Sequence, residues 1–595
     1  MKELKEVSVA VRELAVCPHC DVAMQVQKTV LRRGRTLAHG CFEVHETILI
    51  CSSGCRQDGK PVTARSTQLA QLLVPRGTVG YDVMVYVGCQ RFVHFRQREE
   101  IREQLEKQYG IILSTGEISS LVRRFVVYLA KLHWQSAPAL RAALEGDGGW
   151  TLHVDATGED GRGTVISILA GWRGWVLEAC KAPTERAEFV LPGMLRVAEA
   201  FGAPQAIVRD MGRAMTEAAN EFVKSQQHPI SICVCHQHFL TDVGKDLLAK
   251  RHKQLSDTFS QLKLQPKLRL FARQLGNRLG ESIVDGREAA ARWLLPNSPP
   301  PIPGGVAGIT VVRAFAQWVL DHEADCHGQK FPYALPWHNL HSRCLVVSTA
   351  LAKFLATPPH DVRVRKALEK LKRILDPVQQ HPSLLLVGEA LHKRNDLFNR
   401  LRGALRLFKD GEKDSVQKLN DIDSALERLT VDLKAERPQR GPATDMREAI
   451  DIILAHLKRH GPYLSGRIII TPKGKVLLVA RTNNIEENEF HTLKHGERRR
   501  SGRKKLTQDL EVMPPAALLA GNLRHPDYVS LVCGSLDRLP QTFAQLDAGD
   551  RSVSIAARPS QDMPKTETAS LSSADKKFIR QTLFESRILT AAQLQ

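Results

Sequence analysis

Two kinds of residue in this sequence have the chemistry and spacing needed to bind metal ions, and the first kind is cysteine. Four cysteines lie in two close pairs, 30 residues apart: Cys17, Cys20, Cys51 and Cys55. Tetrahedral Zn²⁺ needs four soft ligands, and each pair can place two thiolates on one tight turn. The spacing therefore predicts a structural Zn²⁺ site. His39 and Cys41 are alternative ligands, and four ordinary buried cysteines are the competing interpretation.

The second kind is acidic. Asp155 and Asp210 each end a short apolar run that is typical of a β-strand. The order is three strands, a helix, a strand, a helix and a final strand, which is that of an RNase H-like fold, with the first and fourth strands side by side. Two carboxylates brought together repel unless a divalent cation lies between them, and hard oxygen ligands suit Mg²⁺ or Mn²⁺. The competing interpretation is that the aspartates only satisfy turns.

A third acid opens a basic segment. Asn484 and Glu487 have capping-box spacing, which places Glu487 in the first turn of a helix. Seven cations follow within twelve residues: Lys494, Arg498, Arg499, Arg500, Arg503, Lys504 and Lys505. A carboxylate beside so dense a cationic run suits a metal site next to a phosphodiester, whereas a solvated helix end is the alternative. Glu486 and Glu489 are rivals to Glu487 as the third acid.

Four motifs in this order resemble those of prokaryotic insertion-sequence transposases with an RNase H-like DDE core, a family related to the Mutator-like elements of eukaryotes. HVDATGE and VRDMGRAM look like the segments that carry the first two catalytic aspartates. Cys235 and His238 match a Cys-x-x-His element, and TNNIEE (482–487) is similar to an Asn-Asn-x-x-Glu motif with a basic tail. By composition alone, CVCHQH (233–238) could also be a metal cluster.

The resemblance implies a transposase in which Asp155, Asp210 and Glu487 hold two Mg²⁺ or Mn²⁺ ions that promote DNA cleavage and strand transfer. It gives Cys235 and His238 a structural or DNA-end role. Double-stranded DNA, as element ends and as target, is the expected partner, bound by a homo-oligomer. The alternatives are an RNase H-like nuclease without strand transfer and an inactive DNA-binding regulator derived from a transposase.

The charge balance also favours a nucleic-acid partner. Lys and Arg number 84 against 64 Asp and Glu, which gives a formal net charge of +20, and basic surfaces attract phosphate backbones. No stretch approaches the roughly 20 apolar residues that span a bilayer, and the charged N-terminus lacks the apolar run of a signal peptide. We therefore expect a cytoplasmic, nucleoid-associated protein with no membrane partner, in which cysteines serve as metal ligands or buried thiols.

The elements that must position these residues indicate a multidomain protein. We predict a zinc-ribbon-like domain at 1–75, a helix-turn-helix-like DNA-binding segment at 80–135, the first part of an α/β RNase H-like core at 149–250, an all-α insertion at 251–465, the final part of the core at 466–550 and a flexible tail at 551–595. Ser114 and Glu117 form a capping box that opens a helix in which Arg123 and Arg124 could face DNA. Any helical hairpin would give the same pattern.

Overall fold

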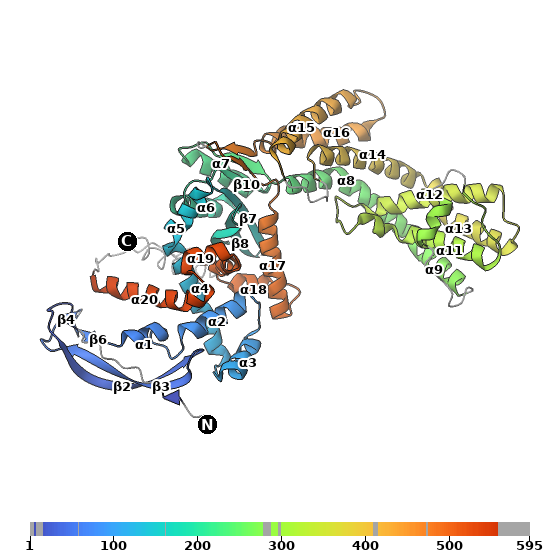
Figure 1. Ribbon diagram of the computed structural model, residues 1–595. Helices are drawn as coiled ribbons and strands as arrows, with labels where there is room; N and C mark the ends of the chain where they lie inside the picture. The colour runs from blue at the N-terminus through green and yellow to red at the C-terminus, as the bar shows by residue number, and fades with distance from the viewer. Residues whose placement is uncertain are drawn as a thin grey trace, which may run out of the picture. The chain divides into compact units, whose positions relative to one another are not determined.

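The computed structural model describes residues 5–6, 16–57, 59–160, 162–277, 287–294, 299–407, 414–471 and 474–556. The chain forms two compact units, which can be followed by colour in Figure 1. We call Met1–Cys233 with Ile469–Gln595 the sheet unit, and Val234–Ile468 the helical unit. Apart from the end of one helix, the tail predicted at 551–595 lies outside the described residues.

The sheet unit begins with a long β-hairpin. Its first elements are β1 (Lys5–Glu6), β2 (Met24–Thr36), β3 (Gly40–Cys51), β4 (Arg56–Gln57), β5 (Lys60–Pro61), β6 (Thr63–Ala64) and α1 (Thr67–Leu72). β2 and β3 pair antiparallel over their whole length, and β1 and β6 also pair with β3. Gly34 on β2 has to be glycine, because a Cβ there would lie 2.2 Å from the ring of Phe42 on β3. The hairpin thus buries an aromatic ring against bare backbone.

Four helices follow the hairpin: α2 (Tyr81–Phe92), α3 (Arg98–Tyr109), α4 (Thr115–Gln135) and α5 (Ala137–Gly146). The predicted capping box at the start of α4 is confirmed, since Ser114 Oγ accepts from Glu117 N and the Glu117 carboxylate accepts from Ser114 N. α4 is amphipathic, and buried residues such as Phe125 and Leu129 belong to the main core of the unit. That core continues without a break into the central sheet.

The central sheet has five strands in the order β11-β10-β7-β8-β9. Its elements are β7 (Thr151–Glu159), β8 (Arg162–Ala170), β9 (Trp175–Ala182), α6 (Ala187–Phe201), β10 (Ala206–Arg209), α7 (Arg213–Ser225) and β11 (Ser231–Val234). β7, β8 and β9 are antiparallel neighbours, whereas β10 runs parallel to β7. The first and fourth strands of this region are therefore side by side, as the acidic pair requires.

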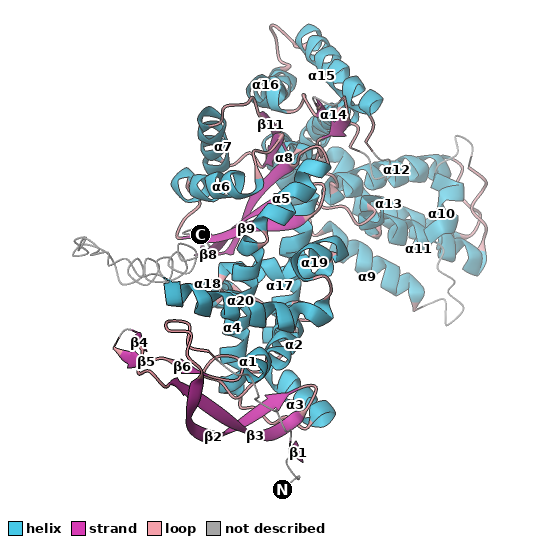
Figure 2. Ribbon diagram, turned by 60° about the vertical axis from the view of Figure 1, so that its left-hand side comes forward, coloured by secondary structure: helices cyan, strands magenta, loops and turns pink. Residues whose placement is uncertain are grey.

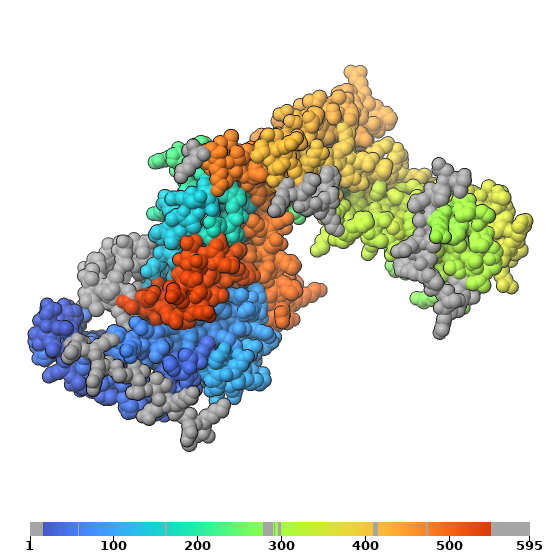
Figure 3. Space-filling view, viewed as in Figure 1, coloured from blue at the N-terminus to red at the C-terminus, as the bar shows by residue number. Residues whose placement is uncertain are grey.

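The C-terminal part of the chain returns to the same unit. Its elements are β12 (Ile468–Ile470), β13 (Val476–Leu478), α17 (Asn484–Ser501), α18 (Thr507–Val512), η3 (Pro515–Arg524), α19 (Pro526–Cys533) and α20 (Leu539–Ala556). Asn522 covers the edge strand β9, because its side-chain amide accepts from Val176 N at 2.7 Å and donates to Val176 O at 2.8 Å. Figure 3 shows the red surface of the last described helices against the blue N-terminal part, where α20 packs on α1, α2 and α4.

The helical unit contains nine described α-helices: α8 (His236–Gln261), α9 (Leu264–Gly276), α10 (Arg287–Leu294), α11 (Gly305–Leu320), α12 (Pro336–Ala356), α13 (Val362–Gln380), α14 (Pro382–Ala404), α15 (Val416–Glu436) and α16 (Thr444–His460). Figure 2 shows these helices in cyan. The unit begins at residue 234, so the boundary that we expected at residue 250 falls inside α8. Arg394 is 4 % exposed and joins three helices through Asp445, which also pairs with Arg251.

Candidate functional site

The four predicted zinc ligands come together at one end of the N-terminal hairpin. The Sγ atoms of Cys17, Cys20, Cys51 and Cys55 all lie within 4.8 Å of one another. Cys17 and Cys51 are buried, and Met24 and Val62 pack beside them. The backbone N–H of Cys55 is the main cause that lowers the pKa of Cys51, to about 6, so one thiolate forms readily. The group could hold a metal ion, and an all-cysteine donor set suits Zn²⁺.

The alternative ligands lie elsewhere on the hairpin. The Cys41 thiol faces Gly110 O at 3.8 Å, and His39 makes an edge-on contact with the Phe42 ring. His39 lies in the turn that joins β2 to β3 and Cys41 is the second residue of β3, whereas Cys51 is the last. Neither is a member of the cysteine group.

The predicted strand end at Asp155 is wrong, because β7 continues to Glu159, whereas Asp210 directly follows β10 as expected. Strand register relates the two aspartates. β10 pairs with β7 in parallel, with Ile207 opposite Leu152 and Val208 opposite His153. Continuing this register by two residues sets Asp210 opposite Asp155, and neighbouring strands lie about 4.8 Å apart. Both aspartates are partly exposed, and local backbone orients each carboxylate. Ala156 N donates to Asp155 Oδ1 at 2.8 Å, and Gly212 N donates to Asp210 Oδ1 at 3.0 Å.

Asn483 connects the start of α17 to β7. Its side chain is fully buried, and its amide nitrogen faces Asp155 Oδ2 at 3.4 Å and Val154 O at 3.5 Å. The amide oxygen therefore points the other way and accepts from His153 Nδ1 at 2.8 Å. The sequence did not mark His153, since only the fold brings it to Asn483. Gly171 leaves room for its ring, because a Cβ at Gly171 would lie 2.3 Å from His153 Nε2.

The expected capping box of Asn484 with Glu487 is wrong. The N-cap of α17 is Asn483, whose side chain contacts β7 instead of capping the helix, so Asn484 is already helical. Glu487 still lies in the first turn, where its N–H donates to Asn483 O at 3.1 Å. The sequence pattern had therefore placed the helix start one residue too late.

Three glutamates of α17 differ in their surroundings. Glu486 is fully buried, and burial together with the nearby charge of Asp155 raises its pKa well above the ordinary value. Ser167 offsets part of that rise, although no hydrogen bond of standard geometry joins the two side chains. Glu487 is partly exposed, like Asp155 and Asp210. Glu489 pairs with Arg524 at 2.5 Å, which leaves it the weakest of the three as a metal ligand.

The three predicted acids do not form a compact cluster. Within the described residues, the four cysteines are the only group of three or more His, Cys, Asp or Glu side chains whose ligand atoms lie within 4.8 Å of one another. Asp155, Asp210 and Glu487 are therefore not gathered at that distance. Another acid is electrostatically coupled to Asp210: burial, and after it the charge of Asp210, raises the pKa of Glu185.

The basic run on and after α17 is largely engaged within the protein. Lys494 donates to Gly158 O, Arg498 pairs with Glu159, Arg500 with Glu497 and Asp509, Arg503 with Asp509, and Lys505 with Asp160. Arg499 and Lys504 are exposed and form no ion pair with a described residue. Among the exposed cations of the run, these two are the ones that a ligand could reach without competition from a described carboxylate.

The predicted DNA-reading helix is α4. Arg123 on this helix is exposed, and Arg124 is partly buried near Gly77. The start of the helix is held by Arg35 of β2, which pairs with Glu117 at 2.7 Å. The N-terminal turn of α4 therefore rests on the hairpin, and Arg123 is the better placed of the two arginines for an external contact.

Cys235 and His238 lie at the beginning of α8, in the helical unit. Cys235 is the buried N-cap residue of α8, and His236 is buried and bonded through Nε2 to Leu464 O at 2.9 Å. The metal cluster that composition allowed at 233–238 is not formed among the described residues. The arrangement is that of a helix start anchored in the core of its unit.

Comparisons with known proteins give no match from which a role for these residues could be inferred. No model of a known protein family matches the chain, and no curated protein is significantly similar to it in sequence. In the part of the chain that the structure describes, no helix is both long and apolar enough to cross a membrane.

Proposed function

We propose that this chain is a DDE-type transposase, which cuts and rejoins double-stranded DNA with Mg²⁺ or Mn²⁺. The observation that carries the proposal is the parallel register of β7 and β10, whose continuation by two residues past Val208 and His153 would set Asp210 opposite Asp155. The strand order β11-β10-β7-β8-β9 supports an RNase H-like core. A third acid comes from α17, whose start is bonded to β7 through Asn483.

The residues present fit hard divalent cations. Burial, and after it the charge of Asp155, raises the pKa of Glu486, so at least two carboxyl groups lie near each other at this end of α17. Asp155, Asp210 and Glu487 would hold the ions, because all three are partly exposed whereas Glu486 is sealed from solvent. Bound ions of this kind activate a nucleophilic water or 3′-hydroxyl and stabilise the leaving oxygen.

The remaining chain supplies orientation and DNA contacts. Asn483 and the N–H of Gly212 orient the two aspartates, and Arg499 and Lys504 offer charge for phosphates. We further propose that the four cysteines hold structural Zn²⁺ in a ribbon-like domain, and that this domain acts with α3 and α4 in reading element ends. In this proposal the protein works as a homo-oligomer on nucleoid DNA in the cytoplasm, and Cys235 and His238 keep a structural or DNA-end role.

The test is an in vitro reaction of the full chain with Mg²⁺ and duplexes made from the DNA that flanks its gene. We expect cleavage at defined positions and joining of the new 3′ ends to a second duplex. Asp155→Asn and Asp210→Asn should abolish both steps while DNA binding persists, and Glu199→Gln, which alters an exposed acid on α6, should behave as wild type. Cleavage without joining would identify a nuclease, and binding without cleavage would identify a regulator.

A further inference from the structure

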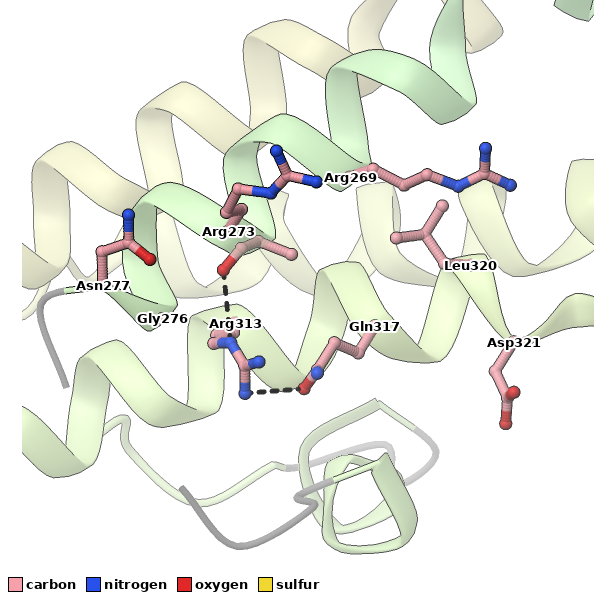
Figure 4. Close-up of a pocket in the computed structure, with 9 residues that line it drawn as sticks. Arg269, Arg273, Gly276, Asn277, Arg313, Gln317, Leu320 and Asp321 are labelled. Atoms are coloured by element: carbon pink, nitrogen blue, oxygen red, sulfur yellow. Dashed lines mark hydrogen bonds between the residues drawn. The ribbon is translucent and has the colours of Figure 1, made fainter. Parts of the chain in front are cut away.

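The helical unit contains a solvent-open hollow lined by arginines. The hollow has a volume of about 560 Å³ and lies between α9 and α11 (Figure 4). Arg269 and Arg273 come from α9, and Arg313 comes from α11. Asp321 is the single acid among its lining residues. The hollow is thus strongly basic, although nothing in the sequence around it forms a motif.

The two arginines of α9 are not neutralised within the unit. Both are exposed, and neither forms an ion pair with any described residue. They are four residues apart, so they lie on the same face of the helix, about 6 Å apart along its axis. Like charges at this spacing destabilise a helix slightly. An anion bound between them would remove that repulsion.

Arg313 is the fixed member of the group. Its Nε donates to Ala272 O of α9 at 3.2 Å, and its Nη1 donates to Gln317 Oε1 at 3.3 Å. Gly276 makes this close approach possible, because a Cβ there would lie 3.2 Å from Arg313 Nε. The guanidinium is therefore held at the seam between the two helices, where Figure 4 shows its hydrogen bonds to the α9 backbone and to Gln317.

We propose that this hollow binds phosphodiester groups of a nucleic-acid backbone, and so gives the helical unit a DNA contact of its own. Arginine suits this ligand because its planar donors match phosphate oxygens in pairs. The hollow is open to solvent, and beside its charged residues only Asn277 and Gln317 line it with polar side chains. This fits a passing backbone better than an enclosed small molecule. The choice of DNA as the source of phosphate rests on the proposed function, whereas the basic hollow itself does not.

The test measures binding of the full chain to a random-sequence duplex at several salt concentrations. Each phosphate contact contributes about 0.9 to the slope of log affinity against log salt, so Arg269→Gln with Arg273→Gln should lower the slope by about 1.8. Lysine at both positions should largely restore it. The matched control is Arg428→Gln with Arg440→Gln, which removes the same charge from exposed positions on and after α15, and its slope should stay at the wild-type value.

Two results would overturn the proposal: an unchanged slope in the Arg269 and Arg273 double variant, or an equal drop in the control. An unchanged slope accompanied by loss of thermal stabilisation by inorganic phosphate would assign the hollow to free phosphate. Failure here is distinct from failure of the proposed function. If wild type cleaves DNA and the double variant has an unchanged slope, only the phosphate site in the hollow is disproved. If wild type binds no DNA, both the phosphate site and the proposed function are disproved.

Discussion

His153 on β7 donates from Nδ1 to the side-chain oxygen of Asn483 at 2.8 Å, which joins two residues 330 positions apart in the chain. The same amide presents its nitrogen to Asp155 at 3.4 Å. One buried side chain therefore fixes the start of α17 and one carboxylate of the candidate site together. The geometry of the acids on α17 relative to the sheet depends on this connection.

Replacing this connecting side chain should affect both stability and metal use. Asn483→Ala removes the hydrogen bond that the buried His153 donates, which should cost about 1–3 kcal/mol of unfolding free energy. It also removes the group that orients Asp155, so the Mg²⁺ concentration for half-maximal cleavage should rise about 10- to 100-fold. Asn488→Ala, at an exposed position of the same helix, is the control. Equal melting and equal Mg²⁺ dependence in the two variants would contradict the assigned role.

Local features of the fold were predictable from the sequence, and the remote ones were not. The cysteine pairs and the Ser114–Glu117 capping box depend on a few neighbouring residues. The His153–Asn483 bond depends on how distant segments pack, and no periodicity in the chain reports it. The same reason explains the wrong capping box at Asn484, because Asn483 uses its side chain on β7.

The sequence also did not reveal which cations of the basic run are paired with acids in the fold. The density of the run predicted free cations, but most of them meet acids such as Glu159 and Asp509 that lie outside the run or on another element. A count of charges along the chain cannot separate cations paired in the fold from cations left to a ligand. For the acids, the apolar runs predicted strands that end at Asp155 and Asp210. This holds for Asp210, which follows β10, but β7 continues past Asp155 to Glu159. The register that relates the two strands came only from the sheet.

The zinc assignment can be tested with a cysteine control in the same hairpin. Cys51→Ser should lose the bound metal and lower the melting temperature, because binding to a site formed only in the folded state contributes to folding. Cys41→Ser should keep the metal, since the Cys41 thiol faces Gly110 O. Zinc content of the purified full chain decides it. Metal retained in the Cys51 variant, or absent from the wild type, would leave the group as buried thiols.

A buried histidine in the sheet unit predicts a pH dependence of stability. Burial lowers the pKa of His133 from 6.5 to about 4, and its ring is bonded to Tyr528 and to Leu177 O. The folded state disfavours the charged ring, so the stability is fully present above pH 6.5 and is lost as pH falls toward 4. The linked change is roughly 3 kcal/mol. The melting temperature of His133→Gln should vary less than that of wild type over this range, whereas exposed His491→Gln should follow wild type.

The ion pairs of the basic run predict two separable effects. Arg499→Ala with Lys504→Ala should lower the salt slope of DNA binding by about 1.8, because these side chains have no described carboxylate partner. Arg498→Ala with Arg500→Ala removes the same charge but breaks pairs to Glu159, Glu497 and Asp509. That variant should lose thermal stability and change the slope less. Equal slopes in the two variants would mean that the ion pairs open when DNA binds.

The last prediction separates the two adjacent glutamates of α17. Glu486 is sealed in the core beside Asp155, which helps to keep its pKa high, so glutamine, a neutral side chain of the same shape, should replace its protonated form well. Glu487 shares partial exposure with both aspartates and can meet an ion from solvent. We therefore expect Glu487→Gln to abolish Mg²⁺-dependent cleavage and Glu486→Gln to retain it within about 10-fold, a difference of about 1.4 kcal/mol in barrier height. Both variants should bind DNA like wild type, which anisotropy with a labelled duplex verifies. Loss of cleavage in the Glu486 variant alone would make Glu486 the third ligand, reached by a movement of α17 that exposes it.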